Sequence, residues 1–127
     1  MNLLLDTHTY IWFSANKPEL SGIVRKMVED SQNNSYISIA SLWEMSIKIS
    51  LGKLSIDKDF KEVIKDLTES GIEILPISFE HVLKSSTLPF HHRDPFDRII
   101  IAQSMCEAMK LLSADTIFDD YTNERVW

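Results

Sequence analysis

Four acidic residues at separate places along the chain carry the chemistry that this sequence suggests. They are Asp6, Glu44, Asp97 and Asp115. Two carboxylates about 5 Å apart repel each other by roughly 3 kcal/mol at an effective dielectric constant of about 20, so a cluster of them needs a compensating cation. Oxygen ligands without Cys or His suit Mg²⁺ or Mn²⁺ better than Zn²⁺. A cation held in this way activates a bound water for hydrolysis of a phosphodiester bond.

Each of these acids also has a purely structural explanation. Asp6 and Asp115 are residues of the type that caps helix N-termini. Asp97 falls in the first turn of a predicted helix, where a negative charge is favourable. Glu44 stands four residues before Lys48, the preferred spacing of an ion pair on a helix surface. Taken singly these explanations are adequate, and only the joint arrangement favours a metal site.

The elements that must position the acids alternate along the chain. Apolar and β-branched runs predict strands at residues 2–5, 35–39, 72–77, 111–113 and 126–127. Helical periodicity predicts helices at residues 7–15, 20–31, 40–51, 59–70, 80–86 and 95–110, the last one capped by Asp94 before Pro95. This alternation predicts an α/β fold in which helices cover both faces of a central, mostly parallel sheet. Asp6 and Asp115 come just after predicted strands, where such sheets gather ligands.

Length and composition predict one domain spanning residues 1–127. The chain has 44% hydrophobic and 25% charged residues, which is typical of a compact protein. The single cysteine and the lack of an apolar run of about 20 residues lead us to expect a cytoplasmic protein that does not enter a membrane. The net charge of −6 argues against broad, charge-driven binding to nucleic acid. A nucleic-acid function therefore needs a local basic patch, a bound cation or a basic partner.

One short loop could supply that basic patch. His91, His92 and Arg93 form the densest group of residues able to contact phosphate, although a solvated loop explains them equally well. His8, next to the acids, is expected to pack against its neighbours rather than to act as a ligand.

Several apolar or aromatic side chains are expected in the core. Cys106 lies on a strongly apolar predicted helix, which favours a buried, unreactive thiol. Trp43 and Phe96 stand among apolar residues at helical spacing, and core packing is preferred for them over stacking on RNA bases. The choice between these roles stays open for Trp12.

Four stretches of sequence match one known family in their order and spacing. They are Leu5-Asp6-Thr7-His8 with Trp12; Ser38-Ile39-Ala40-Ser41-Leu42-Trp43-Glu44 with Lys48 and Leu51-Gly52-Lys53-Leu54; Arg93-Asp94-Pro95-Phe96-Asp97-Arg98 with Ile101-Ala102-Gln103; and Leu112-Ser113-Ala114-Asp115 with Phe118 and Tyr121. Over essentially its full length the chain resembles the PIN-domain ribonucleases, specifically the VapC-type toxins of type II toxin–antitoxin pairs.

The resemblance implies a three-layer α/β/α fold and an endoribonuclease that depends on Mg²⁺ or Mn²⁺. Asp6, Glu44, Asp97 and Asp115 would be its catalytic and metal-binding acids. By the same comparison Thr7 and Ser113 would orient metal-bound water, while Lys48 and Arg98 would support the site. The resemblance also implies an RNA substrate, a cognate antitoxin and a homodimer.

Two other functions remain as alternatives. A PIN-like module that binds nucleic acid or protein without catalysis would keep the same fold. A phosphoacceptor receiver domain is also acidic, α/β and Mg²⁺-binding, but it expects two adjacent acids after the first strand and a lysine after the last. Here Asp6 stands alone after Leu5, and Glu44 lies within a predicted helix.

Overall fold

The computed structural model describes residues 1–127 and is built around a five-stranded, fully parallel sheet. The strands are β1 (Asn2–Leu5), β2 (Asn34–Ser38), β3 (Ile72–Leu75), β4 (Lys110–Leu112) and β5 (Arg125–Val126). Their spatial order is β3-β2-β1-β4-β5, so the first strand is central. The predicted α/β fold with a parallel sheet is therefore confirmed.

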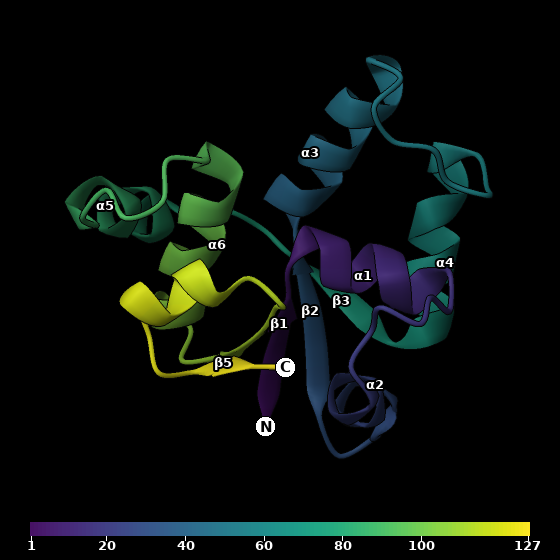
Figure 1. Cartoon of the computed structure of the whole chain (residues 1–127), viewed down its shortest axis with the longest axis horizontal. Helices are drawn as coiled ribbons and strands as arrows, with labels where there is room; N and C mark the ends of the chain where they lie inside the picture. The colour runs from purple at the N-terminus through teal and green to yellow at the C-terminus, as the bar shows by residue number, and fades with distance from the viewer.

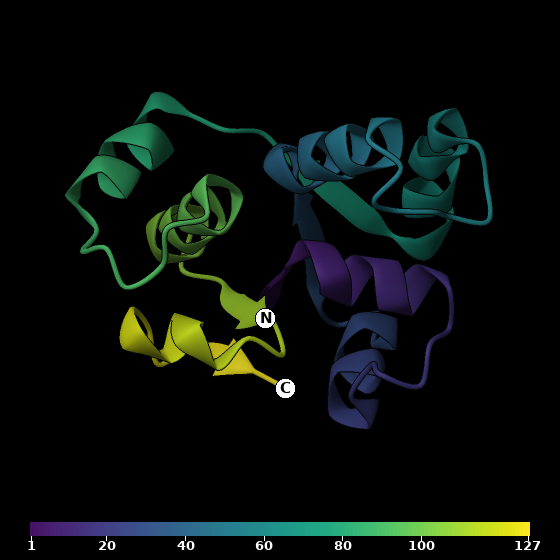
Figure 2. The same ribbon diagram turned by 45° about the horizontal axis from the view of Figure 1, so that its top comes forward.

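Helices cover both faces of this sheet. They are α1 (Thr7–Ser14), α2 (Gly22–Glu29), α3 (Ile39–Ser50), α4 (Val63–Ser70), α5 (Phe79–Thr87) and α6 (Pro95–Cys106), with short 3₁₀ turns at Phe60–Glu62 (η1) and Thr116–Asp120 (η2). Figure 1 and Figure 2 show α1 to α4 on one side of the sheet and α5, α6 and η2 on the other. The molecule thus has three layers.

The side chains of β1 divide the core between these two sides. Leu3 and Leu5 belong to one buried cluster, which includes Val24 from α2 and Leu67 from α4. Leu4 points the other way, into a second cluster that contains three consecutive residues of α6. Successive side chains of a strand point to opposite faces, so one short apolar strand anchors both helical layers. None of the helices has both the length and the apolar character that a membrane span requires.

The last long helix ends earlier than its sequence predicts. It was expected to reach about Lys110, whereas α6 ends at Cys106 and Lys110 already belongs to β4. The turn between them places Ala108 in the left-handed region, with φ at +52°, and the Met109 N–H donates to the Ser104 carbonyl at 2.9 Å. Glycine usually occupies this position after a helix. With alanine there, the sequence gives no stop signal.

Three further expectations about local structure were wrong. The predicted helix at 59–70 is split into the η1 turn and α4. Cys106 is exposed at the end of α6 rather than buried, with its sulfur 3.9 Å from the Glu80 carbonyl of α5. Trp43 is 62% exposed on α3, where its ring meets Phe96 edge to face at 5.4 Å.

Candidate functional site

The carboxyl ends of β1 and β4 fix the position of Asp6. Leu5 and Leu112 are paired in register, and the Asp6 N–H donates to the Leu112 carbonyl at 3.1 Å. Asp6 then begins α1 as its N-cap, with its carboxylate accepting from the Thr9 N–H at 2.8 Å. The Thr9 hydroxyl donates back to the same Leu112 carbonyl. Asp6 is therefore both a helix cap and a rigidly held acid at the edge of the sheet.

The Asp6 carboxyl group is almost completely buried. Burial raises its pKa above the ordinary value, and hydrogen bonds from Ser113 and Thr9 only partly offset this effect. Removing a carboxylate from water disfavours its charged form unless a cation or several donors compensate. Asp6 is thus an acid whose charged form still lacks an adequate partner within the chain.

Glu44 enters the site from α3. Its side chain is buried, Thr7 donates a hydroxyl hydrogen to one carboxylate oxygen at 2.7 Å, and Lys48 lies 2.7 Å from the other. The Lys48 pKa is raised, mainly by this bond to Glu44 and also by the charges of Asp94 and Asp97. Lys48 is therefore paired with Glu44 and also interacts electrostatically with the two acids at the start of α6.

Asp97 lies in the first turn of α6, and Asp94 caps this helix by accepting from the N–H groups of Phe96 and Asp97. The Asp97 pKa is raised to about 7, first by burial and then by the negative charges of nearby acids. Those acids are Asp94, Glu44, Asp6 and Asp115. The other three acids singled out in the sequence therefore all act electrostatically on Asp97, which is the expected property of a shared site.

Asp115 completes the group from the segment after β4. It caps the η2 turn by accepting from the Ile117 N–H, and its own N–H donates to the Ser113 hydroxyl at 3.0 Å. Its side chain is about half exposed, so it stands at the mouth of the site. A shallow pocket of about 280 Å³ lies here, lined by Asp6, His8, Trp12, Ala114 and Asp115.

Sequence reasoning did not place His92 among the acids. Its Nε2 atom lies 2.9 Å from Asp97 Oδ2 and 3.6 Å from Asp115 Oδ2, so that one ligand atom of each residue falls within 4.8 Å of the others. The neighbouring side chains of His91 and Arg93 are exposed. No periodic pattern signals the proximity of His92 to Asp97, because it arises from the path of an irregular loop.

Arg98 was expected beside the acids, but it makes no ion pair with any of them. Its buried guanidinium group instead donates to four backbone carbonyls of the preceding segment, that of Ser85 in the last turn of α5 and those of Leu88, Pro89 and His92 in the loop. Arg98 therefore acts on the shape of this loop rather than on the carboxylates.

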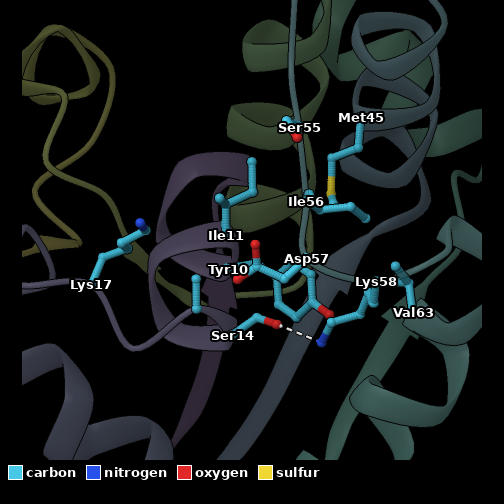
Figure 3. Close-up of a pocket in the computed structure, with 11 residues that line it drawn as sticks. Tyr10, Ile11, Ser14, Lys17, Met45, Ser55, Ile56, Asp57, Lys58 and Val63 are labelled. Atoms are coloured by element: carbon cyan, nitrogen blue, oxygen red, sulfur yellow. Dashed lines mark hydrogen bonds between the residues drawn. The ribbon is translucent and has the colours of Figure 1, made fainter.

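A second pocket, of about 170 Å³, contains none of the four acids. It lies between α1, Met45 of α3 and residues 55–58. Figure 3 shows Ser14 hydrogen-bonded to Lys58 at its wall, and Lys58 also pairs with Asp66, which accepts from Tyr10. These contacts tie α1 to α4. The balanced charges of this group contrast with the uncompensated negative charge at the end of the sheet.

The donor set of the acidic site fits a hard divalent cation. It consists mainly of carboxylate oxygens, two of them on buried side chains, with the His92 Nε2 atom beside Asp97 and Asp115, and Lys48 is the only lysine or arginine paired with any of the four acids. Mg²⁺ and Mn²⁺ prefer such oxygen ligands. A cation of this kind would offset the repulsion that raises the Asp97 pKa.

Comparison with known proteins agrees with this fold. The PIN domain family model matches residues 3–124, and the chain belongs to this family. No curated protein shows significant sequence similarity to it.

Three solved structures share the fold at low sequence identity. A toxin–antitoxin complex from Klebsiella pneumoniae is 20% identical, with a TM-score of 0.67 over 98% of this chain and 96% of that one. VapBC2 from Rickettsia felis, bound to a DNA fragment from its promoter, is 16% identical, with a TM-score of 0.70 over 99% and 96%. FitAcB from Neisseria gonorrhoeae is 17% identical, with a TM-score of 0.59 over 91% and 89%.

Proposed function

We propose that this protein is a metal-dependent endoribonuclease, the toxin of a toxin–antitoxin pair. The observation that carries the proposal is the gathering of Asp6, Glu44 and Asp115 around Asp97, whose pKa is raised by burial and by the charges of these acids. Acids held together against their mutual repulsion are expected at a site that binds a cation. Membership of the PIN domain family supports nuclease chemistry.

Asp6, Glu44, Asp97 and Asp115 would hold Mg²⁺ or Mn²⁺. When bound, such a cation lowers the pKa of a water and offsets the charge on the leaving oxygen of a phosphodiester. The hydroxyl groups near the acids act on the carboxylates in this structure. Thr7 donates to Glu44, and Ser113 bonds to Asp6 and to the backbone of Asp115. We therefore assign Thr7 and Ser113 to the orientation of the acids.

Some of the basic residues would support the acidic site, and others would contact the RNA substrate. Lys48 reduces the negative charge on Glu44, and Arg98 shapes the loop that precedes α6. His91 and Arg93 have exposed side chains and remain our candidates for contact with RNA phosphates, whereas His92 is turned toward the acids.

A cognate antitoxin is the proposed partner. The structures that share this fold include toxin–antitoxin complexes, which supports such a partner for this chain. The net charge of −6 favours a partner that carries a basic segment. RNA substrate and antitoxin would meet the protein in the cytoplasm, and we expect it to act there as a homodimer.

The test is cleavage of end-labelled structured RNAs by the purified chain with Mg²⁺ or Mn²⁺. We expect discrete cuts that disappear with a chelator and in the Asp97→Asn variant, which excludes a contaminating nuclease. If folded protein free of antitoxin cuts no RNA in a broad pool, the non-catalytic binding module is the correct function.

A further inference from the structure

We propose that His92 is a positioning residue, which holds Asp97 and Asp115 at the spacing that the divalent cation requires. The inference rests on the metal site of the proposed function. His92 is not one of the four acids. The loop before α6, which carries it, would thus take part in metal binding.

The first step is the orientation of the His92 ring. Nδ1 accepts a hydrogen bond from the Asp94 N–H at 3.3 Å, so the ring proton of the neutral imidazole lies on Nε2. Nε2 faces Asp97 Oδ2 at 2.9 Å and Asp115 Oδ2 at 3.6 Å. The Nε2 atom is buried, and it forms a hydrogen bond with neither carboxylate. One N–H group therefore stands between two acids from different elements.

The second step is the rigidity of the His92 backbone. The His92 N–H donates to the Tyr121 hydroxyl at 2.7 Å, and this hydroxyl donates to the Pro89 carbonyl, also at 2.7 Å. The His92 ring packs at a tilt against Phe118, with 5.9 Å between ring centroids. The segment after β4 therefore fixes both ends of the residue, its backbone through Tyr121 and its ring through Phe118.

The third step is the buried charge that shapes the same loop. Arg98 donates to four carbonyls, of which that of His92 is one, and the exposed ring of Phe90 covers the guanidinium at 4.3 Å. A buried guanidinium without a carboxylate partner is costly unless its donors are well satisfied. Here four carbonyls satisfy them in the observed path of the chain before α6. That path brings the His92 ring to Asp97 and Asp115.

These contacts predict an effect on metal affinity. Groups that orient metal ligands without touching the metal typically change its affinity by 10- to 100-fold when they are removed. The His92 N–H lies between the carboxylates of Asp97 and Asp115 and reduces their repulsion by its position, without a hydrogen bond to either. Without it the two carboxylates would repel each other more strongly, and the cation would have to bring them together on binding. Loss of the N–H should therefore weaken cation binding.

The experiment measures binding of Mn²⁺ to the full chain, by calorimetry and by the electron paramagnetic resonance signal of free Mn²⁺. His92→Leu removes the N–H group, and we expect about a 10-fold weaker Mn²⁺ affinity. His92→Gln returns an amide N–H at a similar reach, and its affinity should stay within about 3-fold of the original by the same reasoning. Gln32→Leu is the control and should leave binding unchanged, because Gln32 is an exposed turn residue before β2, at the opposite end of that strand from the acids.

Tyr121→Phe provides a second test that leaves the imidazole in place. It removes the hydroxyl that joins the His92 N–H to the Pro89 carbonyl, and it should weaken Mn²⁺ binding in the same direction. Thermal melting without metal establishes that each variant is folded. If His92→Leu fails to fold, Tyr121→Phe alone decides the outcome.

Three results would overturn the proposal. Unchanged Mn²⁺ affinity in folded His92→Leu and Tyr121→Phe variants would show that the loop does not position the acids. Equal losses in the Leu and Gln variants would make the imidazole a metal ligand instead. A parent chain that binds no Mn²⁺ would overturn the metal site itself, and with it the proposed function. The parent chain thus separates failure of the function from failure of the His92 inference.

Discussion

The hydroxyl group of Thr7 donates to the carboxylate of Glu44 at 2.7 Å and joins the start of α1 to the middle of α3. Both side chains are buried, and the donor follows Asp6 directly in the sequence. The end of β1 thus leads into Asp6, which is one of the acids, and then into Thr7, which contacts α3. The Thr7 hydroxyl therefore links Glu44 on α3 to the residue that follows Asp6.

Replacing that hydroxyl should cost stability. Thr7→Val keeps the shape of the side chain but leaves a Glu44 oxygen without its donor, and a hydrogen bond to a charged group contributes about 1.5–3 kcal/mol. We expect the free energy of unfolding in urea to fall by about this amount. Thr7→Ser keeps the hydroxyl and serves as the control. A Val variant as stable as the Ser variant would contradict the assigned bond.

Asp97→Asn should stabilise the metal-free protein while abolishing cleavage. The Asp97 pKa is raised from 3.8 to about 7, so the folded state binds this proton more tightly than the unfolded state does. The resulting stability is complete below about pH 4 and is lost as the pH rises to about 7. At ~1.4 kcal/mol per pKa unit, the loss has an upper bound of about 4 kcal/mol.

The measurement is the free energy of urea unfolding in a chelator at several pH values between 4 and 8. The Asn variant should lack the decline that the parent chain shows over this range, and should be the more stable of the two at pH 8. Equal slopes for both proteins would mean that Asp97 titrates normally in the folded chain.

Mn²⁺ affinity should increase as the pH rises toward 7. The cation binds the charged form of Asp97. Because the Asp97 pKa is raised to about 7, the carboxyl group keeps its proton at lower pH, and the cation must displace that proton. Below the pKa we expect close to a 10-fold gain in affinity per pH unit, and a plateau above it. Calorimetry in two buffers of different ionisation enthalpy would detect the released proton. Affinity that is constant between pH 5.5 and 8 would argue against Asp97 as a ligand.

Ala108→Gly should stabilise the fold. Ala108 adopts φ +52° in the turn after α6, a conformation that costs an L-residue roughly 1–2 kcal/mol. Glycine avoids this strain but has more freedom in the unfolded chain, so a net gain of about 0.5–1 kcal/mol is expected. Gly71→Ala is the reverse control. Gly71 ends α4 at φ +71°, and a Cβ atom added there would have open space around it. The stability lost in Gly71→Ala should therefore reflect backbone strain alone.

The sequence was sufficient to predict the parallel sheet and the helices that cover it. Short apolar runs such as Leu3 to Leu5 have few alternatives to a buried strand, and Asp94 before Pro95 marks a helix start through local chemistry. Both features depend on residues that are adjacent in the chain. Pattern reasoning works best for features of this kind.

The surroundings of individual side chains were harder to predict, because they depend on distant segments. His92 meets Asp97 only because Tyr121 and the Arg98 guanidinium fix the loop path. Trp43 stands among apolar residues in the sequence, yet its ring lies on the surface. Its helix buries the opposite side, which carries Glu44 and Met45.

The order of strands has a consequence for how the protein emerges from the ribosome. β1 is made first, but its partner β4 is among the last segments to be made, and Thr9 bonds to Leu112 across 103 positions of sequence. Asp115 joins the other acids only when β4 has paired. Contacts between such distant segments form late in folding. The acidic site of a nascent chain would therefore stay incomplete until its synthesis is nearly finished.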